Sequence, residues 1–155
     1  MRFVLRIFAI ATLVAACGQT ATQTGVSPTP QASPTPNEVG TATLTETECD
    51  FAMPDRLPTT LLGFSLVTRT KYTGHFGLIR IDDEHSYKDL VDSWYGSGGQ
   101  VAPSFGALVA EKAVPPNSSG RLVATITLKG TYAFHCGYQD ESGKVTGFFH
   151  ELRAG

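Results

Sequence analysis

Hydrophobic and polar residues alternate most regularly in the stretch from Gly130 to Cys136. Its sequence is G-T-Y-A-F-H-C, in which Tyr132, Phe134 and Cys136 share one side and the residues between them share the other. A period of two residues is typical of a β-strand with one buried face. We therefore expect a strand here that ends at the Cys136 thiol.

A polar segment with turn-forming residues follows this strand. Asp140, Ser142 and Gly143 favour a loop, because such residues occupy turn conformations at little steric cost. A second run, from Gly147 to Leu152, is rich in aromatic residues and favours another short strand. The pattern predicts a loop between the cysteine and this run.

Five further short runs have strand patterns bounded by turn signals. They are residues 49–53, 61–70, 78–81, 107–114 and 122–128. The last two flank the sequence P-P-N-S-S-G, which favours a turn, so we expect them to pair as a hairpin.

Helical spacing occurs at one place in the chain. Ser86 precedes Asp89 by three residues, as in a capping box, and Leu90, Val91 and Trp94 recur at helical intervals. A glycine-rich stretch, 96–99, follows and ends the pattern. About seven short strands and one helix predict an all-β fold: an antiparallel, Greek-key β-sandwich with a short helix inserted.

The first 16 residues have the pattern of an export signal. Arg2 and Arg6 precede an apolar run, 7–16, that is too short to span a bilayer. The sequence V-A-A-C at its end resembles the lipobox of bacterial lipoproteins. The resemblance implies that Cys17 is acylated with fatty acids such as palmitate, which anchor the mature chain to a bacterial membrane outside the cytoplasm.

Residues 17–45 differ in composition from the rest of the chain. They consist mostly of Thr, Pro, Ser, Gln, Ala and Gly, which predicts a disordered linker and leaves 46–155 as a single folded domain. Without Arg2 and Arg6, 10 basic residues remain against 14 acidic ones, a net charge of −4. This balance excludes nucleic acid as an expected partner, because its phosphates require a basic surface.

Four segments of the domain together resemble the cupredoxins. They are D-F-A-M-P at 50–54, Gly74-His75 before a Leu/Ile strand, the helical insertion at 86–95, and G-T-Y-A-F-H-C at 130–136. The resemblance covers most of the chain from Asp50 onward. It implies a cupredoxin-like sandwich of the plastocyanin and azurin type.

The resemblance also implies positions for copper ligands. A type 1 site needs two histidines, a cysteine and a weak axial ligand such as methionine. Similarity places the first histidine at His75 and the thiolate at Cys136. The loop after the cysteine departs from the family pattern, because its short-loop ligand positions hold Gln139 and Glu141.

The remaining ligands are also missing from the pattern. No methionine follows Met53, and His150 is the one histidine after Cys136. His135 is expected on the opposite face of the strand from its neighbour Cys136, where it is a poor ligand partner. The sequence therefore predicts an incomplete copper ligand set, with His150 as the candidate second histidine.

The cysteines support a second interpretation. Once Cys17 is acylated, Cys49 and Cys136 remain as an even pair in an oxidising compartment, where such pairs often form disulfides. A buried free thiol is the alternative for Cys136. Either arrangement makes this cysteine a structural residue.

We therefore expect an extracytoplasmic, lipid-anchored binding or structural module without type 1 copper. It would be a monomer with an unidentified protein or small-molecule partner. The alternative is an electron carrier or copper chaperone that uses His75, Cys136 and an atypical remaining ligand. A third hypothesis is a small apolar ligand held between the helix at 87–95 and the sheet. No catalytic residue is assigned, because no G-x-S-x-G, H-E-x-x-H or zinc-type cysteine pair occurs.

Overall fold

The computed structural model describes residues 34–99 and 102–155, which form one compact unit. The signal peptide, Cys17 and the linker up to residue 33 lie outside the described residues. Within them, nine strands and one helix follow in this order: β1 Asn37–Leu44, β2 Cys49–Ala52, β3 Arg56–Leu57, β4 Leu61–Thr68, β5 Gly74–Ile81, α1 Tyr87–Gly96, β6 Gly106–Val114, β7 Ser119–Thr125, β8 Gly130–Gln139 and β9 Val145–Ala154.

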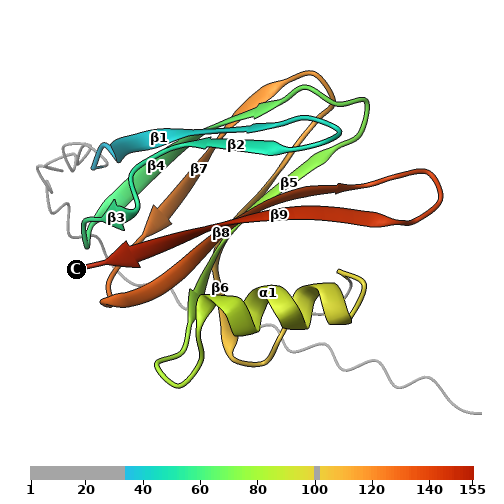
Figure 1. Ribbon diagram of the computed structural model, residues 1–155. Coiled ribbons are helices and arrows are strands. Elements are labelled where there is room, and N and C mark those ends of the chain that lie inside the picture. Colours follow the sequence, from blue (N-terminus) through green and yellow to red (C-terminus); the bar gives the residue numbers. More distant parts are fainter. Residues whose placement is uncertain (1–33, 100–101) are drawn as a thin grey trace, which may run out of the picture. The chain divides into compact units, whose positions relative to one another are not determined.

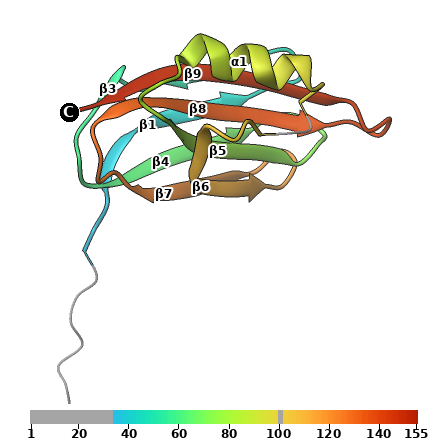
Figure 2. The same ribbon diagram turned by 90° about the horizontal axis from the view of Figure 1, so that it is seen from below.

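The strands form a β-sandwich of two sheets (Figures 1 and 2). One sheet has four strands in the order β2-β1-β4-β7, and the other has five in the order β3-β9-β8-β5-β6. The sandwich predicted from the hydrophobic pattern is thus confirmed. Two strand pairs, β1 with β4 and β3 with β9, are parallel, so the sheets are mixed rather than purely antiparallel.

Strand β1 lies in the range that we expected to belong to the linker. It pairs with both β2 and β4, and its residues Ala42 and Leu44 are completely buried. The predicted domain start at residue 46 is therefore wrong for this segment. Its Thr- and Ala-rich composition resembles that of the linker, whereas two buried side chains and backbone pairing with two neighbours determine the strand.

The predicted hairpin between residues 107–114 and 122–128 is also not formed. Strand β6 belongs to the five-stranded sheet, whereas β7 pairs antiparallel with β4 in the other sheet. The turn between them, where Asn117 has a positive φ of 49°, carries the chain from one sheet to the other. A turn sequence specifies that the chain reverses, but it does not specify which strand the returning segment joins.

The helix begins where the capping box predicts. The Ser86 side chain accepts a hydrogen bond from the Asp89 amide, and the Asp89 carboxylate accepts one from the Ser86 amide at 2.8 Å. Hydrogen bonds of this kind satisfy backbone donors that a helix start leaves unpaired. No helix in the described ranges is long and apolar enough to cross a membrane.

The five-stranded sheet has two faces with different coverings. The inner face, which includes Tyr132, Phe134 and Cys136, packs against the four-stranded sheet and forms the main core. The outer face bears α1, which lies beside β8 and β9 (Figure 2). Leu90 of the helix packs there with Ile79, Ile81 and Ala133 in a smaller cluster. The sheet is therefore covered on both sides, although the helix spans only part of the outer face.

Candidate functional site

The segment after Cys136 is a β-hairpin. Strand β8 continues to Gln139, and Gly137, Tyr138 and Gln139 pair with β9. The expectations that the strand ends at the cysteine and that a loop extends to residue 147 are therefore wrong. The turn itself is as predicted, because the Asp140 carboxylate accepts hydrogen bonds from the amides of Ser142 and Lys144, and Gly143 has a φ of +84°.

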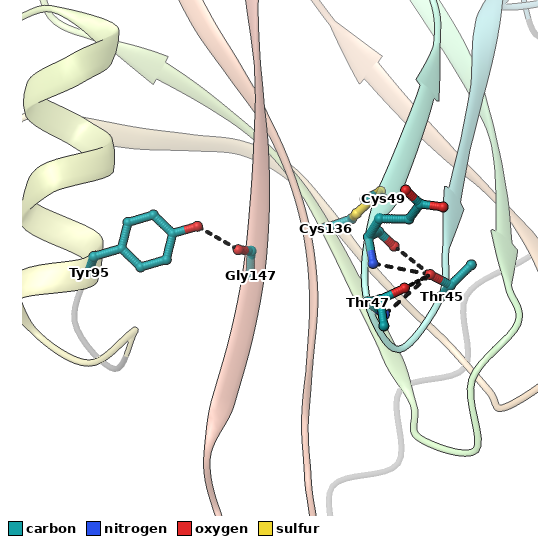
Figure 3. The surroundings of a disulfide bond; sticks show 7 residues. Thr45, Thr47, Cys49, Tyr95, Cys136 and Gly147 are labelled. Atoms are coloured by element: carbon teal, nitrogen blue, oxygen red, sulfur yellow. Dashed lines mark hydrogen bonds between the residues drawn. A yellow bond between two sulfur atoms is a disulfide. The ribbon is translucent and has the colours of Figure 1, made fainter.

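Cys136 lies on the inner face and is bonded to Cys49 (Figure 3). It has no exposed surface, and the Cα atoms of the two cysteines are 6.6 Å apart. Because Cys49 is in β2 and Cys136 is in β8, the bond joins the two sheets across the core. The disulfide predicted as one of two structural alternatives is thus present, and the thiolate that a copper ion requires is not available in this form of the protein.

The turn between β1 and β2 positions Cys49. The Thr45 hydroxyl accepts hydrogen bonds from the amides of Thr47 and Glu48, at 3.3 and 3.1 Å (Figure 3). On the other side of the disulfide, the Tyr138 hydroxyl donates to the Glu46 carbonyl oxygen at 2.8 Å. The Thr45 bonds lie within the β1–β2 turn, and the Tyr138 bond joins the end of β8 to that turn.

His75 lies on the opposite face of the sheet from Cys136. In the β5–β8 register, Phe76 is opposite Cys136 and His75 is opposite Gly137. Partners in an antiparallel pair share a face and neighbouring residues alternate, so the exposed imidazole of His75 extends from the outer face. The sheet therefore separates the first two residues of the candidate copper site.

His150 lies on the inner face but at a different place from the disulfide. It pairs with Phe134 in the register, stacks on Phe51 with ring centroids 5.2 Å apart, and its Nε2 atom is 3.4 Å from an Asp55 carboxylate oxygen. Its ring is thus held at the edge of the sandwich near β2 and β3. The structure does not bring His75, Cys136 and His150 together.

These positions do not fit a type 1 copper ion. Such an ion needs a thiolate and two imidazoles in one plane, whereas here the sulfur is oxidised and the nearest candidate imidazole faces the other side of the sheet. Among the described residues, no group of three or more His, Cys, Asp or Glu side chains is placed to hold a metal ion.

A cavity of about 830 Å³ occupies the part of the outer face that the helix does not cover. Its walls are mainly apolar, and they include Ile79 and Leu108, from β5 and β6, Val145 at the start of β9, and Pro103. Leu108 remains 57% exposed although it is a large apolar side chain. The register between β5 and β6 shifts beside Ile79, and this irregularity places Leu108 opposite it on the outer face.

Two histidines and the single tryptophan of the chain also line this cavity. In the register, His75 pairs with Gly137 and Gly77 pairs with His135. Each histidine is therefore opposite a glycine, and the two imidazoles lie at diagonal positions on the outer face. Trp94 of α1 completes the aromatic wall, with its ring centroid 4.8 Å from that of His135. Gly77 leaves room above the sheet, whereas the space over Gly137 is filled by the backbone of β9 at Thr146 and Gly147.

His135 is the most unusual group in this wall. Its ring packs against Trp94 and against Phe149, whose centroid is 4.9 Å away, and its Nε2 atom is buried without a hydrogen-bond partner among the described residues. The pKa of His135 is lowered from 6.5 to about 4, mainly by burial and to a smaller extent by the nearby His75. The imidazole is therefore neutral at ordinary pH.

Gly147 allows the two rings to approach the sheet closely. A Cβ atom placed on Gly147 would lie 2.9 Å from His135 Nε2 and 3.1 Å from the Trp94 indole nitrogen, both too close. The helix is fixed at the same residue, because the Tyr95 hydroxyl donates to the Gly147 carbonyl oxygen at 2.9 Å (Figure 3). The role of this glycine under the two rings was not predicted from the sequence.

Sequence reasoning found some of these residues for other reasons. The placement of His135 opposite to Cys136 is confirmed. The hypothesis of a ligand between the helix and the sheet required a cavity there, but Leu90 fills that space by packing with Ile79 and Ala133, and the cavity lies beside the helix near Trp94. The glycines Gly77 and Gly137 were missed. Their signal is the spacing H-x-G in both strands, at 75–77 and 135–137, which places an imidazole and a glycine on the same face.

Comparison with known proteins gave structural similarities alone. No protein-family model and no curated protein sequence matches the chain. Auracyanin B is 15% identical over 80% of this chain and 93% of its own, with a TM-score of 0.47. Auracyanin A of Chloroflexus aurantiacus, described as a "blue" copper protein, is 13% identical over 77% and 100%, with a TM-score of 0.46. Reduced auracyanin of Roseiflexus castenholzii is 16% identical over 80% and 99%, with a TM-score of 0.43.

Proposed function

We propose that this protein is an extracytoplasmic, lipid-anchored binding module with a cupredoxin-like fold that does not use type 1 copper. Its binding surface is the outer-face cavity beside Trp94. The observation that carries this proposal is the disulfide between Cys49 and Cys136, which occupies the sulfur that copper would need and uses it to join the two sheets. The cavity lies on the other face and is independent of that bond.

The extracytoplasmic location rests on two features. The N-terminal sequence has an export signal followed by Cys17 in a lipobox-like context, and disulfides persist mainly in oxidising compartments. Twenty residues separate the start of β1 from the end of the signal, counting from Cys17 to Pro36. At about 3 Å per residue for an extended Pro-rich segment, such a tether reaches at most about 60 Å from the membrane.

Copper binding is tested by adding Cu(II) to the full chain with its disulfide intact. We expect no intense blue absorption from copper–thiolate charge transfer, and no reaction of Cys49 or Cys136 with a thiol reagent until the protein is reduced. The contrary result, a blue species that disappears in Cys136→Ser, would establish the electron-carrier or chaperone alternative. A variant with Met53→Leu serves as a control, because Met53 is not a candidate ligand and its substitution should leave any genuine blue species unchanged.

Anchoring is tested separately by Cys17→Ser. We expect the wild-type chain to fractionate with membranes and to incorporate labelled palmitate, and the variant to lose both properties because no thiol remains for acylation. Cys49→Ser is the matched control and should keep the label. Equal membrane association of wild type and Cys17→Ser would refute the lipid anchor and leave the binding proposal to be judged on its own.

A further inference from the structure

We propose that the outer-face cavity binds an uncharged aromatic molecule that carries a hydroxyl group. This inference rests on the proposed binding function and names the chemical class of the ligand. It depends on four properties of the cavity: its size, its apolar and aromatic walls, an acidic side chain that disfavours anions, and a histidine ring without a hydrogen-bond partner among the described residues.

The size of the cavity suits a small organic molecule. Its volume of about 830 Å³ lies in the range of roughly 300–1,000 Å³ that is usual for such sites. Leu108, Ile79 and Val145 present apolar surface to this space, and a ligand would cover the exposed Leu108 side chain. Removing apolar surface from water gives a favourable free energy on both sides of the contact.

The aromatic wall favours a planar ring in the ligand. The rings of Trp94, His135 and Phe149 contact one another at centroid distances of 4.8 to 5.5 Å, so they form one rigid cluster. Two of them, Trp94 and His135, line the cavity. Aromatic rings pair favourably in offset or edge-to-face arrangements, and a cluster that is already packed loses little entropy when a further ring binds.

The electrostatics of the wall disfavour an anion. Glu111 is opposite Gly77 in the register and so lies on the outer face, whereas Lys112 is opposite Phe76 and lies on the other face. His135 is neutral because its pKa is low, so it offers no positive charge to an anion. A carboxylate in this space would lose water and lie near an acidic side chain without gaining an ion pair, which is costly.

His135 accounts for the hydroxyl group. No hydrogen bond among the described residues involves its ring, and Nε2 is fully buried beside Gly147, so Nδ1 is the ring nitrogen left for a ligand. A neutral imidazole has one nitrogen that donates and one that accepts, depending on the tautomer. A hydroxyl group both donates and accepts, so it can pair with Nδ1 in either tautomer.

The test compares three probes of the same shape on the full, disulfide-bonded chain near neutral pH. These are 2-naphthol, naphthalene and the anion 2-naphthoate, with dissociation constants from calorimetry. Trp94 is the one tryptophan in the sequence, so its indole N–H signal in a nitrogen–proton NMR spectrum reports on this cavity alone. We expect 2-naphthol to shift that signal and to bind roughly 2- to 10-fold more tightly than naphthalene, the effect of one net hydrogen bond. We expect 2-naphthoate to bind at least about 10-fold more weakly than 2-naphthol.

Two variants separate the contributions of shape and hydrogen bonding. Gly77→Val places a side chain in the cavity, and the nearest atoms to its Cβ are Leu108 Cδ1 at 3.6 Å and the Ala110 carbonyl oxygen at 3.8 Å, so the fold has room for it. It should weaken both neutral probes at least 10-fold without lowering the melting temperature. His135→Phe keeps an aromatic ring beside Trp94, and it should abolish the preference for 2-naphthol over naphthalene.

Several results would overturn the inference. They are equal binding of 2-naphthol and naphthalene by the wild type, binding of 2-naphthoate as tight as that of 2-naphthol, and binding that leaves the Trp94 signal unchanged. Each of these results would refute the ligand class or the site. The proposed function would still be supported if the same preparation showed no copper–thiolate absorption band. A blue copper species with no probe binding would refute the proposed function itself.

Discussion

The two faces of strand β8 differ in chemistry at adjacent residues. Cys136, on the inner face, has no exposed surface and is bonded to the other sheet, whereas His135, on the outer face, borders a cavity and has no hydrogen-bond partner there. Strand alternation alone separates them. The inner face therefore uses its cysteine to join the two sheets, and the outer face places its histidine in the wall of the cavity.

This contrast shows that the two faces of one strand are under different packing constraints. The inner residues Tyr132, Phe134 and Cys136 are needed for core packing whether or not a metal is present. The outer residues contribute to a small cluster under the helix and to the cavity, so they are freer to vary in chemistry. The predictions below perturb one face at a time.

The largest effect is expected from removing the disulfide on the inner face. Its cysteines are 87 residues apart, and by loop entropy alone such a cross-link contributes about 4–5 kcal/mol. Cys49→Ala with Cys136→Ala should lower the free energy of unfolding by about that amount, measured by guanidinium denaturation. The pKa of His135, followed by imidazole proton NMR, should remain about 4 in this variant. A large change in that pKa would show that the faces are coupled.

The next effect belongs to the outer face and depends on pH. Histidine has a pKa of about 6.5 when unfolded, and in the folded protein that of His135 is about 4, so the unfolded state binds more protons between these values. Its contribution to stability is therefore complete above pH 6.5 and lost as the pH falls towards 4, by about 3 kcal/mol.

His135→Phe isolates this contribution from the carboxylates that also titrate at low pH. The free energy of unfolding of the wild type minus that of the variant should decrease by about 3 kcal/mol across the window. A difference independent of pH would contradict the buried, neutral state of this ring. His75→Ala should raise the pKa of His135 only slightly, because burial is the larger cause of its shift.

A smaller effect is expected from two glycines that face the same side of the sheet. A Cβ on Gly137 would collide with the Thr146 carbonyl oxygen and lie 3.0 Å from the Gly147 Cα atom, both in the backbone of β9. Gly137→Ala should therefore cost about 1–3 kcal/mol, as overpacking does. Gly77→Ala is the matched control, because its nearest contacts are of ordinary length, and it should change stability by less than about 0.5 kcal/mol. Equal losses of stability in thermal unfolding would mean that the space beside Gly77 is not open.

The smallest effect concerns the helix that borders the cavity. Ser86→Ala removes the N-cap and should cost about 1 kcal/mol, because backbone amides at the helix start lose their acceptor. The Trp94 indole signal should shift, and the signals of inner-face residues should not. Ser93→Ala, inside the same helix, is the control and should cause no loss, since alanine has the higher helix propensity.

The strands with a clear period of two could be predicted from the sequence, as could the capped helix. Strand β3 was not predicted, because two residues, Arg56 and Leu57, are too few to form a pattern. Strand β1 was assigned to the linker for its composition, and its pairing with β2 and β4 is a long-range property. The predicted partner of β7 was wrong for a similar reason, since turn residues do not specify which sheet the next strand joins.

The candidate site was predictable in its parts but not in its arrangement. Cys136 and His75 were identified from the sequence as candidate ligands, and the missing second histidine and methionine argued against copper. The period of two already separates Cys136 from His135. It does not tell on which side of the neighbouring strand His75 lies, because that depends on the β5–β8 register. One residue of register shift would exchange the two faces of β5.

The sequence by itself determined the export signal pattern, the alternation of Gly130–Cys136, the helix start at Ser86 and the pair of cysteines left after Cys17. These are local or compositional properties, and each requires only nearby residues. The tertiary structure decided that Cys49 and Cys136 form a bond across the sandwich, that their strand continues into a hairpin, and that His75, His135 and Trp94 surround one cavity. These depend on strand order and register, which are set by packing between residues far apart in the chain.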